Sequence, residues 1–216
     1  MTSRQRSGRP AKLFAAAVIV AIMPYAPPTF GHAAGMAVTA TRLSTFKPSG
    51  LPPVCTSQTL TASADTWVNE QQSTTNYGTA ASLSVTARNG RNARTLVHFT
   101  LPTAPAGCTL VSATLRTFTT SATTGRTLAV SRAAAAWTEG GTTWATMPGL
   151  AGTAVNTSSA AGWVQWTVTT HVEAMYSGTN EGFVVRDATE GGATTFTQIF
   201  GSREATNKPE LVLQWG

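Results

Sequence analysis

A succession of short apolar runs, each separated from the next by turn-forming residues, most constrains how this chain can fold. The last third of the chain contains three of them, at Gly182–Val185, Phe196–Phe200 and Leu211–Leu213. The segments between them carry Gly191-Gly192, Asn207 and Pro209. Strand-length runs with this punctuation are typical of successive antiparallel strands. We therefore predict three consecutive strands between Glu181 and Trp215.

The same pattern continues back to Cys55. Further runs lie at Thr59–Val68, Ser82–Ala87, Arg94–Leu101, Leu110–Thr119, Thr127–Arg132 and Trp163–Val168. About nine or ten short strands at this spacing predict an all-β fold, an antiparallel β-sandwich of the jelly-roll type. One short helix is expected at His171–Tyr176, because Thr170 and Glu173 have the spacing of a capping box.

Residue parity along the predicted strands indicates which side chains form the core, since alternate residues point to opposite faces. In Arg94–Leu101 one face contains Thr95, Val97, Phe99 and Leu101 and leaves His98 on the other. The same rule assigns core positions to Val111, Ala113, Leu115, Leu211, Leu213 and Trp215.

The N-terminal segment has the three-part layout of a secretory signal peptide. Basic residues come first, at Arg4, Arg6, Arg9 and Lys12, followed by the apolar run Leu13–Met23 and by small residues at Gly31–Ala34. The run is short of the roughly 20 residues that span a membrane, so an uncleaved anchor is the less favoured alternative. We predict a signal peptide at 1–34, a linker or disordered arm at 35–54, and a secreted module at 55–216 without membrane attachment after cleavage.

The formal charge of +6 comes largely from this leader. Four of the fifteen basic residues lie in the first twelve positions, and the remaining eleven exceed the nine acidic residues by two. Nucleic-acid binding usually needs a concentrated basic face, so this class is disfavoured. An apolar content of 42% with 11% charged residues indicates a folded chain.

Cys55 and Cys108 are the two cysteines of the chain. An oxidising compartment favours a disulfide between them, and two buried free thiols are the alternative. Two cysteines are too few for a structural zinc site by themselves.

Several short motifs follow one another in a characteristic order. They are Ala64–Val68, Thr75–Gly78, Ala113–Arg116, Trp137–Gly140, Thr143-Trp144, Gly182–Asp187 and Ser202–Glu204. In this order they resemble the DNRLRE domains, secreted bacterial β-sandwiches that include carbohydrate-binding module family 96, over about residues 55–215. The resemblance implies non-catalytic polysaccharide binding, with alginate-like acidic polymers as the substrate class. His98 departs from it, because relatives often carry Arg there.

Exposed aromatic rings are the first candidates for sugar contact, because a flat rigid ring stacks on a sugar face at little entropic cost. Parity places Trp166 in the core, and the motifs at Trp137 and Trp144 indicate structural roles. Trp67, Trp163 and Tyr77 remain as candidate binding residues. The alternative is that they are edge aromatics with half of their area covered.

The segment Arg88–Arg94 contains Arg88, Arg91 and Arg94 and no acidic residue, and we predict that it forms a hairpin tip. Arginine pairs well with carboxylates, which favours an anionic polysaccharide such as a uronate. A solvated turn without a ligand is the alternative.

No nucleophile elbow, zinc-protease motif or phosphate loop is present in the sequence. We therefore expect no enzyme activity and no cofactor. The family resemblance implies structural roles for Glu139, Asp187 and Glu204. Three alternatives remain open: a structural calcium held by Asp187 and Glu190, a lyase built on His98, Tyr176 and an arginine, and an adhesive or structural extracellular domain without sugar specificity. The expected state is a monomer with a polysaccharide as its partner.

Overall fold

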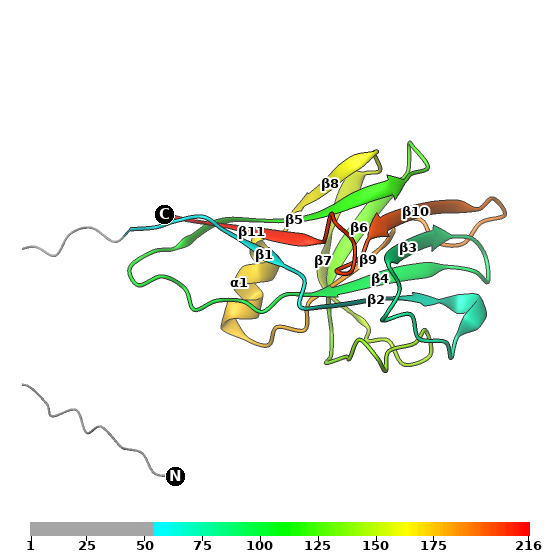
Figure 1. Ribbon diagram of the computed structural model, residues 1–216, viewed down its shortest axis with the longest axis horizontal. Coiled ribbons are helices and arrows are strands. Elements are labelled where there is room, and N and C mark those ends of the chain that lie inside the picture. Colours follow the sequence, from blue (N-terminus) through cyan, green and yellow to red (C-terminus); the bar gives the residue numbers. More distant parts are fainter. Residues whose placement is uncertain (1–53) are drawn as a thin grey trace, which may run out of the picture. The chain divides into compact units, whose positions relative to one another are not determined.

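The computed structural model describes residues 54–216, so the predicted signal peptide and nearly all of the predicted arm lie outside the described residues. The described chain is almost entirely β-structure (Figure 1). Its strands are β1 (Gln58–Thr61), β2 (Ala64–Asn69), β3 (Ser82–Ala87), β4 (Ala93–His98), β5 (Leu110–Ser121), β6 (Thr127–Ala133), β7 (Leu150–Ser158), β8 (Gly162–Thr167), β9 (Phe183–Asp187), β10 (Phe196–Gly201) and β11 (Glu210–Trp215). Two short helices, η1 (Glu70–Gln72) and α1 (Thr169–Ser177), complete it.

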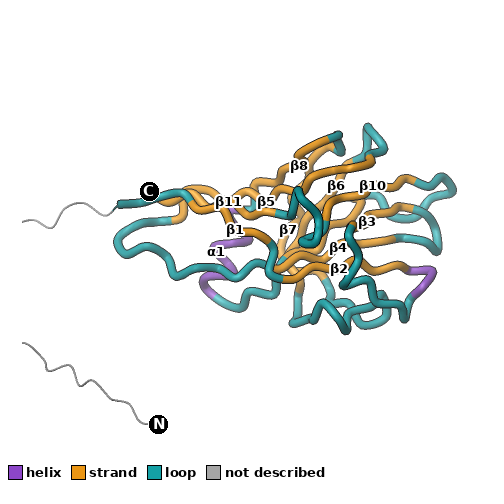
Figure 2. The backbone as a smooth tube through the Cα atoms, viewed as in Figure 1, coloured by secondary structure: helices purple, strands orange, loops and turns teal. Residues whose placement is uncertain are grey.

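The strands form one continuous sheet that curls over on itself as a sandwich (Figure 2). Its order is β1-β11-β5-β10-β3-β4-β9-β6-β7, with β2 added beside β4 and β8 beside β5. Each pairing is antiparallel. The predicted all-β antiparallel sandwich with one short α-helix is therefore confirmed.

β5 organises one layer of the sandwich because it pairs with β11, β10 and β8 along its length. Its side chains alternate, with Ala113, Leu115 and Thr117 fully buried and the residues between them half-exposed. Val111 breaks the predicted pattern and is 60% exposed. The cause is a register shift, because Ser112 faces Gln214 while Leu110 faces Trp215. The bulge turns Val111 away from the core.

The main core lies between the curled layers, and most of its parity assignments are confirmed. Val97, Phe99, Leu211 and Leu213 are essentially inaccessible to solvent. Trp166 is 1% exposed, and its indole nitrogen donates to the carbonyl of Leu128, 3.1 Å away. A buried indole nitrogen usually has a hydrogen-bond partner, and the Leu128 carbonyl is the partner of Trp166.

A second, smaller core lies on the opposite side of β4 and β9. It contains Val68, Leu96, Ala133 and Val184, covered by Trp137, Trp144 and Met147 from the long segment between β6 and β7. β4 is consequently buried on both faces. The indole nitrogen of Trp137 donates to the carbonyl of Glu181 at 2.8 Å, which fixes the covering segment.

Two strand predictions differ from the structure. The run Thr59–Val68 is divided into β1 and β2 at Ala62-Ser63, where the chain leaves β11 and joins β4. β7 was not predicted. It pairs with β6 alone among the sheet neighbours. Its residues are exposed or half-exposed, and its Ala, Gly, Thr and Asn residues show no apolar alternation.

α1 confirms the predicted helix but not its predicted cap. The N-cap residue is Val168, and it makes no side-chain capping bond, so Thr170 and Glu173 do not form a capping box. Thr169 instead accepts a hydrogen bond from the amide of Ala113 at 3.0 Å, which attaches the helix to β5. No helix within residues 54–216 is long and apolar enough to cross a membrane.

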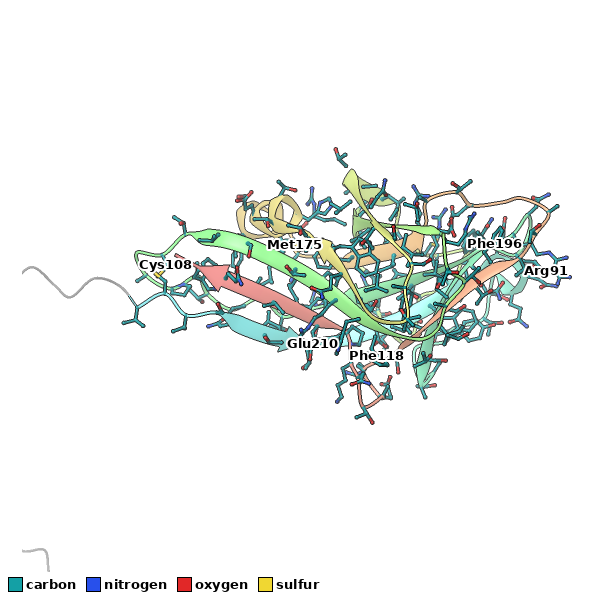
Figure 3. All side chains as sticks on the ribbon, turned by 90° about the horizontal axis from the view of Figure 1, so that it is seen from above. Arg91, Cys108, Phe118, Met175, Phe196 and Glu210 are labelled. Carbon is teal, nitrogen blue, oxygen red and sulfur yellow. A yellow bond between two sulfur atoms is a disulfide. The ribbon has the colours of Figure 1, made fainter. Side chains whose placement is uncertain are left out.

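The predicted disulfide is present. Cys55 and Cys108 are joined, with their Cα atoms 5.8 Å apart. The bond ties the segment before β1 to the loop before β5, at the left end of the molecule in Figure 3.

Candidate functional site

One end of the sandwich is built from the β3–β4 turn, η1 and the β9–β10 loop, and we call it the loop end. Asn92 holds these three segments together. Its backbone and side-chain nitrogens donate to Glu70 Oε2 at 3.0 and 2.7 Å. Its Oδ1 accepts from the amides of Arg88 and Gly191 at 3.1 and 2.9 Å. The loop end is therefore a fixed platform rather than a set of independent loops.

The loop end contains all three predicted arginines, in different states. Arg91 is exposed on the β3–β4 turn, at the end of the molecule in Figure 3. Arg88 is half-buried, and one Nη donates to the Thr195 hydroxyl at 3.1 Å. Arg94 binds both oxygens of Glu190, at 2.7 and 2.6 Å. The 88–94 segment contains no acid, but the fold supplies one to Arg94.

Trp67 and Tyr77 stack on each other, with ring centroids 3.9 Å apart and planes 20° apart. Both are half-buried, and Trp67 also packs against the main core. In the sequence, Trp67 shares the parity of the charged Asp65, which predicts a ring open to solvent. That reasoning is wrong, because Asp65 is itself 1% exposed and marks an inward face. Tyr77 covers the outer side of Trp67, and its hydroxyl contacts Gln72 Oε1.

Trp163 lies on a different surface. It faces Phe118 across β8 and β5, and the two rings meet at 79° with centroids 5.5 Å apart. The guanidinium of Arg116 lies 4.8 Å from the centre of the Trp163 ring. Figure 3 shows Phe118 far along the sandwich from Arg91. The structure thus separates Trp163 from the three arginines of the loop end, and Tyr77 contacts the loop end through Gln72 of η1.

The two carboxylates considered for calcium are both paired with arginine. Asp187 binds Arg126 through both oxygens at 2.9 and 2.7 Å, and Glu190 binds Arg94. Within residues 54–216 no group of three or more acidic, histidine or cysteine side chains could hold a metal ion. Arg126 also lies over the ring of Phe196, 4.1 Å from its centre.

Several of the sequence motifs meet in one polar cluster formed by Asp65, Glu139, Arg203 and Glu204. Asp65 Oδ2 accepts from the amide of Arg203 at 2.7 Å, and the amide of Asp65 donates to Glu139 Oε1 at 3.0 Å. The Arg203 side chain bridges Glu139 and Glu204 at 2.9 and 3.0 Å. Burial raises the pKa of Asp65 to about 7, and the nearby Glu204 and Glu139 add to the effect. The cluster joins β2 to two distant loops.

A groove of about 520 Å³ brings His98 and Tyr176 together. The ring nitrogens of His98 contact the Ser63 hydroxyl at 2.9 Å and the Asn180 carbonyl at 3.1 Å. The Tyr176 hydroxyl donates to the Pro102 carbonyl at 3.0 Å, and burial raises its pKa. No arginine or carboxylate is among the residues that line this groove in the described part of the chain. The third element of the lyase alternative is therefore not there.

Comparison with known protein families shows which family the chain belongs to. Residues 56–215 match carbohydrate-binding module family 96 over their whole length. The chain belongs to this family. No curated protein matches the chain.

In this family 96 module, sequence reasoning missed several residues that shape the two surfaces. Asn92 organises the loop end, and Arg116 and Phe118 stand beside Trp163. Phe118 and Arg116 could have been found, because both have the parity opposite to the buried Leu115 and Thr117. Nothing in the local sequence indicates that Asn92 bridges three segments.

Proposed function

We propose that this family 96 module is a secreted, non-catalytic domain that binds acidic polysaccharides at its loop end. Arg88 and Arg91 pair with sugar carboxylates there, and the outer side of Tyr77 offers an aromatic contact. The observation that supports this most directly is the exposed Arg91 beside Arg88 on a platform fixed by Asn92.

The charge balance of the loop end favours an anionic ligand. Glu190 and Asp187 are each matched by an arginine, Arg94 and Arg126. Glu70 is held by Asn92 rather than by a cation. Arg88, Arg91 and Arg186 have no carboxylate partner within residues 54–216, and Arg186 donates to the carbonyls of Asp187 and Ala188. The surplus is positive, so a polyanion gains electrostatic energy on approach.

The predicted roles of Trp67 and Arg94 in binding become indirect ones. Trp67 supports Tyr77 from below, and Arg94 holds the β9–β10 loop through Glu190. Each positions a contact residue and does not present an open surface of its own. Trp163 belongs to the second face.

The hydrogen bonds and ion pairs of the acidic residues support a non-catalytic role. A glycosidase needs two carboxyl groups facing each other across a groove that admits the sugar. Asp187 and Glu190 are engaged by arginines, and Asp65 is buried beneath Arg203. Secretion is supported by the disulfide, because such bonds persist in oxidising compartments.

Retention of the full chain on immobilised polysaccharides, uronic and neutral, at low and high salt tests the proposal. We expect retention on a uronate that weakens with salt. In the double variant Arg88→Ala/Arg91→Ala the affinity should fall roughly 2- to 30-fold, since two ion pairs at the protein surface contribute about 0.2–1 kcal/mol each.

Lys208→Ala is the matched control, because it removes an exposed positive charge on the segment between β10 and β11. It should leave uronate retention nearly unchanged. Equal losses in Lys208→Ala and in Arg91→Ala would show a general charge effect and refute the loop-end site. No retention on any polysaccharide would favour a structural or adhesive domain.

A further inference from the structure

The outward side of β5 and β8 carries an aromatic pair that neither core uses. We call it the β8–β5 face and define it by Phe118, Trp163, Arg116 and Gln165. Phe118 and Trp163 are absent from both clusters of buried apolar residues, yet both are half-buried aromatic rings. The two hydrophobic cores therefore do not explain why Phe118 and Trp163 lie on this face.

The rings are held in one arrangement by their neighbours. Trp163 contacts Phe118 edge to face, and Arg116 lies over the indole. A ligand that stacks on the indole would therefore use the face away from Arg116. Two fixed rings lose little entropy when a flat ligand stacks on them.

Polar groups continue the face along the strands. Arg116 stands opposite Gln165, and Thr114 stands opposite Thr167 in the next pair on this side. From the aromatic pair to the threonine pair the face extends over roughly 13 Å, since each strand residue adds about 3.3 Å. Gln165 and Thr167 are exposed and offer a neutral amide and a hydroxyl to ligand hydroxyl groups.

The positive charge of Arg116 on the β8–β5 face is balanced by a neighbouring carboxylate. Arg116 forms an ion pair with Glu210 of β11, beside Phe118 in Figure 3. A sugar carboxylate placed on Arg116 would also meet the carboxylate of Glu210. A neutral sugar meets no such repulsion and can use both partners of the pair as hydrogen-bond donor and acceptor.

We propose that the β8–β5 face is a second glycan site, specific for a neutral polysaccharide chain, whose pyranose ring stacks on Trp163. The proposal rests on the proposed function of the module as a polysaccharide binder. It makes the protein bivalent, with an anionic chain at the loop end and a neutral chain on the β8–β5 face. Such a module would link two kinds of polymer in one matrix.

The test is calorimetric titration of the full chain with neutral hexasaccharides of glucose, mannose and galactose and with a hexauronate. The variants are Trp163→Ala, Trp163→Phe and Arg91→Ala. For at least one neutral sugar, Trp163→Ala should lower the affinity fivefold or more, while Trp163→Phe retains most of it because a ring remains. Hexauronate binding should show the reverse of the pattern for the neutral sugar. It should be unchanged in Trp163→Ala and weakened in Arg91→Ala.

Raising the salt concentration should leave neutral-sugar binding nearly constant, because no charged pair forms. Hexauronate binding without any neutral-sugar binding would overturn this inference and leave the proposed function intact. Loss of both ligands in Trp163→Ala, with an unchanged thermal midpoint, would show a single site and also overturn it. A change of solution mass in Trp163→Ala would identify the face as an interface between copies instead. Failure of the wild-type chain to bind either class would refute the proposed function itself.

Discussion

Replacing Asp65 by Asn should remove a pH-dependent loss of stability that the wild-type protein carries. Asp65 is 1% exposed, and the amide of Arg203 donates to it at 2.7 Å. Burial, reinforced by Glu204 and Glu139, raises the pKa of Asp65 from 3.8 to about 7. Asn has nearly the same shape and keeps an oxygen for the Arg203 amide, but it does not ionise.

Proton linkage determines whether the unfolding free energy rises or falls with pH. Between about pH 4 and pH 7 the folded state holds a proton on Asp65 that the unfolded state has lost, so stability falls as the pH rises. The loss is complete above the folded pKa, and below pH 4 both states are protonated. The pKa difference corresponds to about 4 kcal/mol at most, because each pKa unit is worth about 1.4 kcal/mol.

Urea unfolding of the wild type and of Asp65→Asn between pH 4.5 and 8.5 measures this directly. The difference in unfolding free energy between the two proteins should be smallest at pH 4.5, and the variant should become progressively more stable than the wild type up to pH 8. Glu204→Gln is the control, because it removes one repelling charge and should reduce the pH-dependent loss without abolishing it. If the difference in unfolding free energy between wild type and variant stays constant across this range, the folded protein does not raise the pKa of Asp65.

Three further predictions concern what holds the module together. Replacing Cys55 and Cys108 by Ser should lower the unfolding free energy by about 4 kcal/mol by the chain-entropy model for a separation of 53 residues, and a thermal midpoint equal to that of the oxidised wild type would contradict it. Trp166→Ala should cost about 3–5 kcal/mol in urea unfolding, because a fully buried ring is lost, whereas a loss below about 1 kcal/mol would mean that Trp166 is not part of the core. Gly78→Ala should lower the thermal midpoint, because the new methyl group would lie 2.2 Å from the Glu139 carbonyl oxygen, and an unchanged midpoint would place that turn elsewhere.

The fold was largely predictable because strand signals are local. Most strands were located within one or two residues, since short alternating runs and turn residues mark them directly. β7 was missed because its exposed and half-exposed residues carry no apolar alternation, and its position depends on pairing with β6. Val111 was misassigned because a bulge depends on the partner strand, and nothing in β5 alone reveals it.

The site was less predictable because it depends on contacts between distant segments. The exposed Arg91 and the core position of Trp166 follow from local pattern. The pairing of Arg94 with Glu190 joins residues 96 positions apart, and the sequence does not show it. The position of Trp67 does not follow from parity, because Asp65, the charged residue on the same face of β2, is buried in a polar cluster.

The most direct test of the central claim is a nitrogen-15 NMR titration of the full chain with hexauronate at low salt. The backbone amides of residues 88–92 and 191–195, which form the loop end, should show the largest shifts. At equal, sub-saturating ligand concentration the shifts of the same amides should be smaller in Arg88→Ala/Arg91→Ala, because the affinity of this variant is lower. Shifts centred on the groove beside His98 and Tyr176, with the loop end unaffected, would contradict the account.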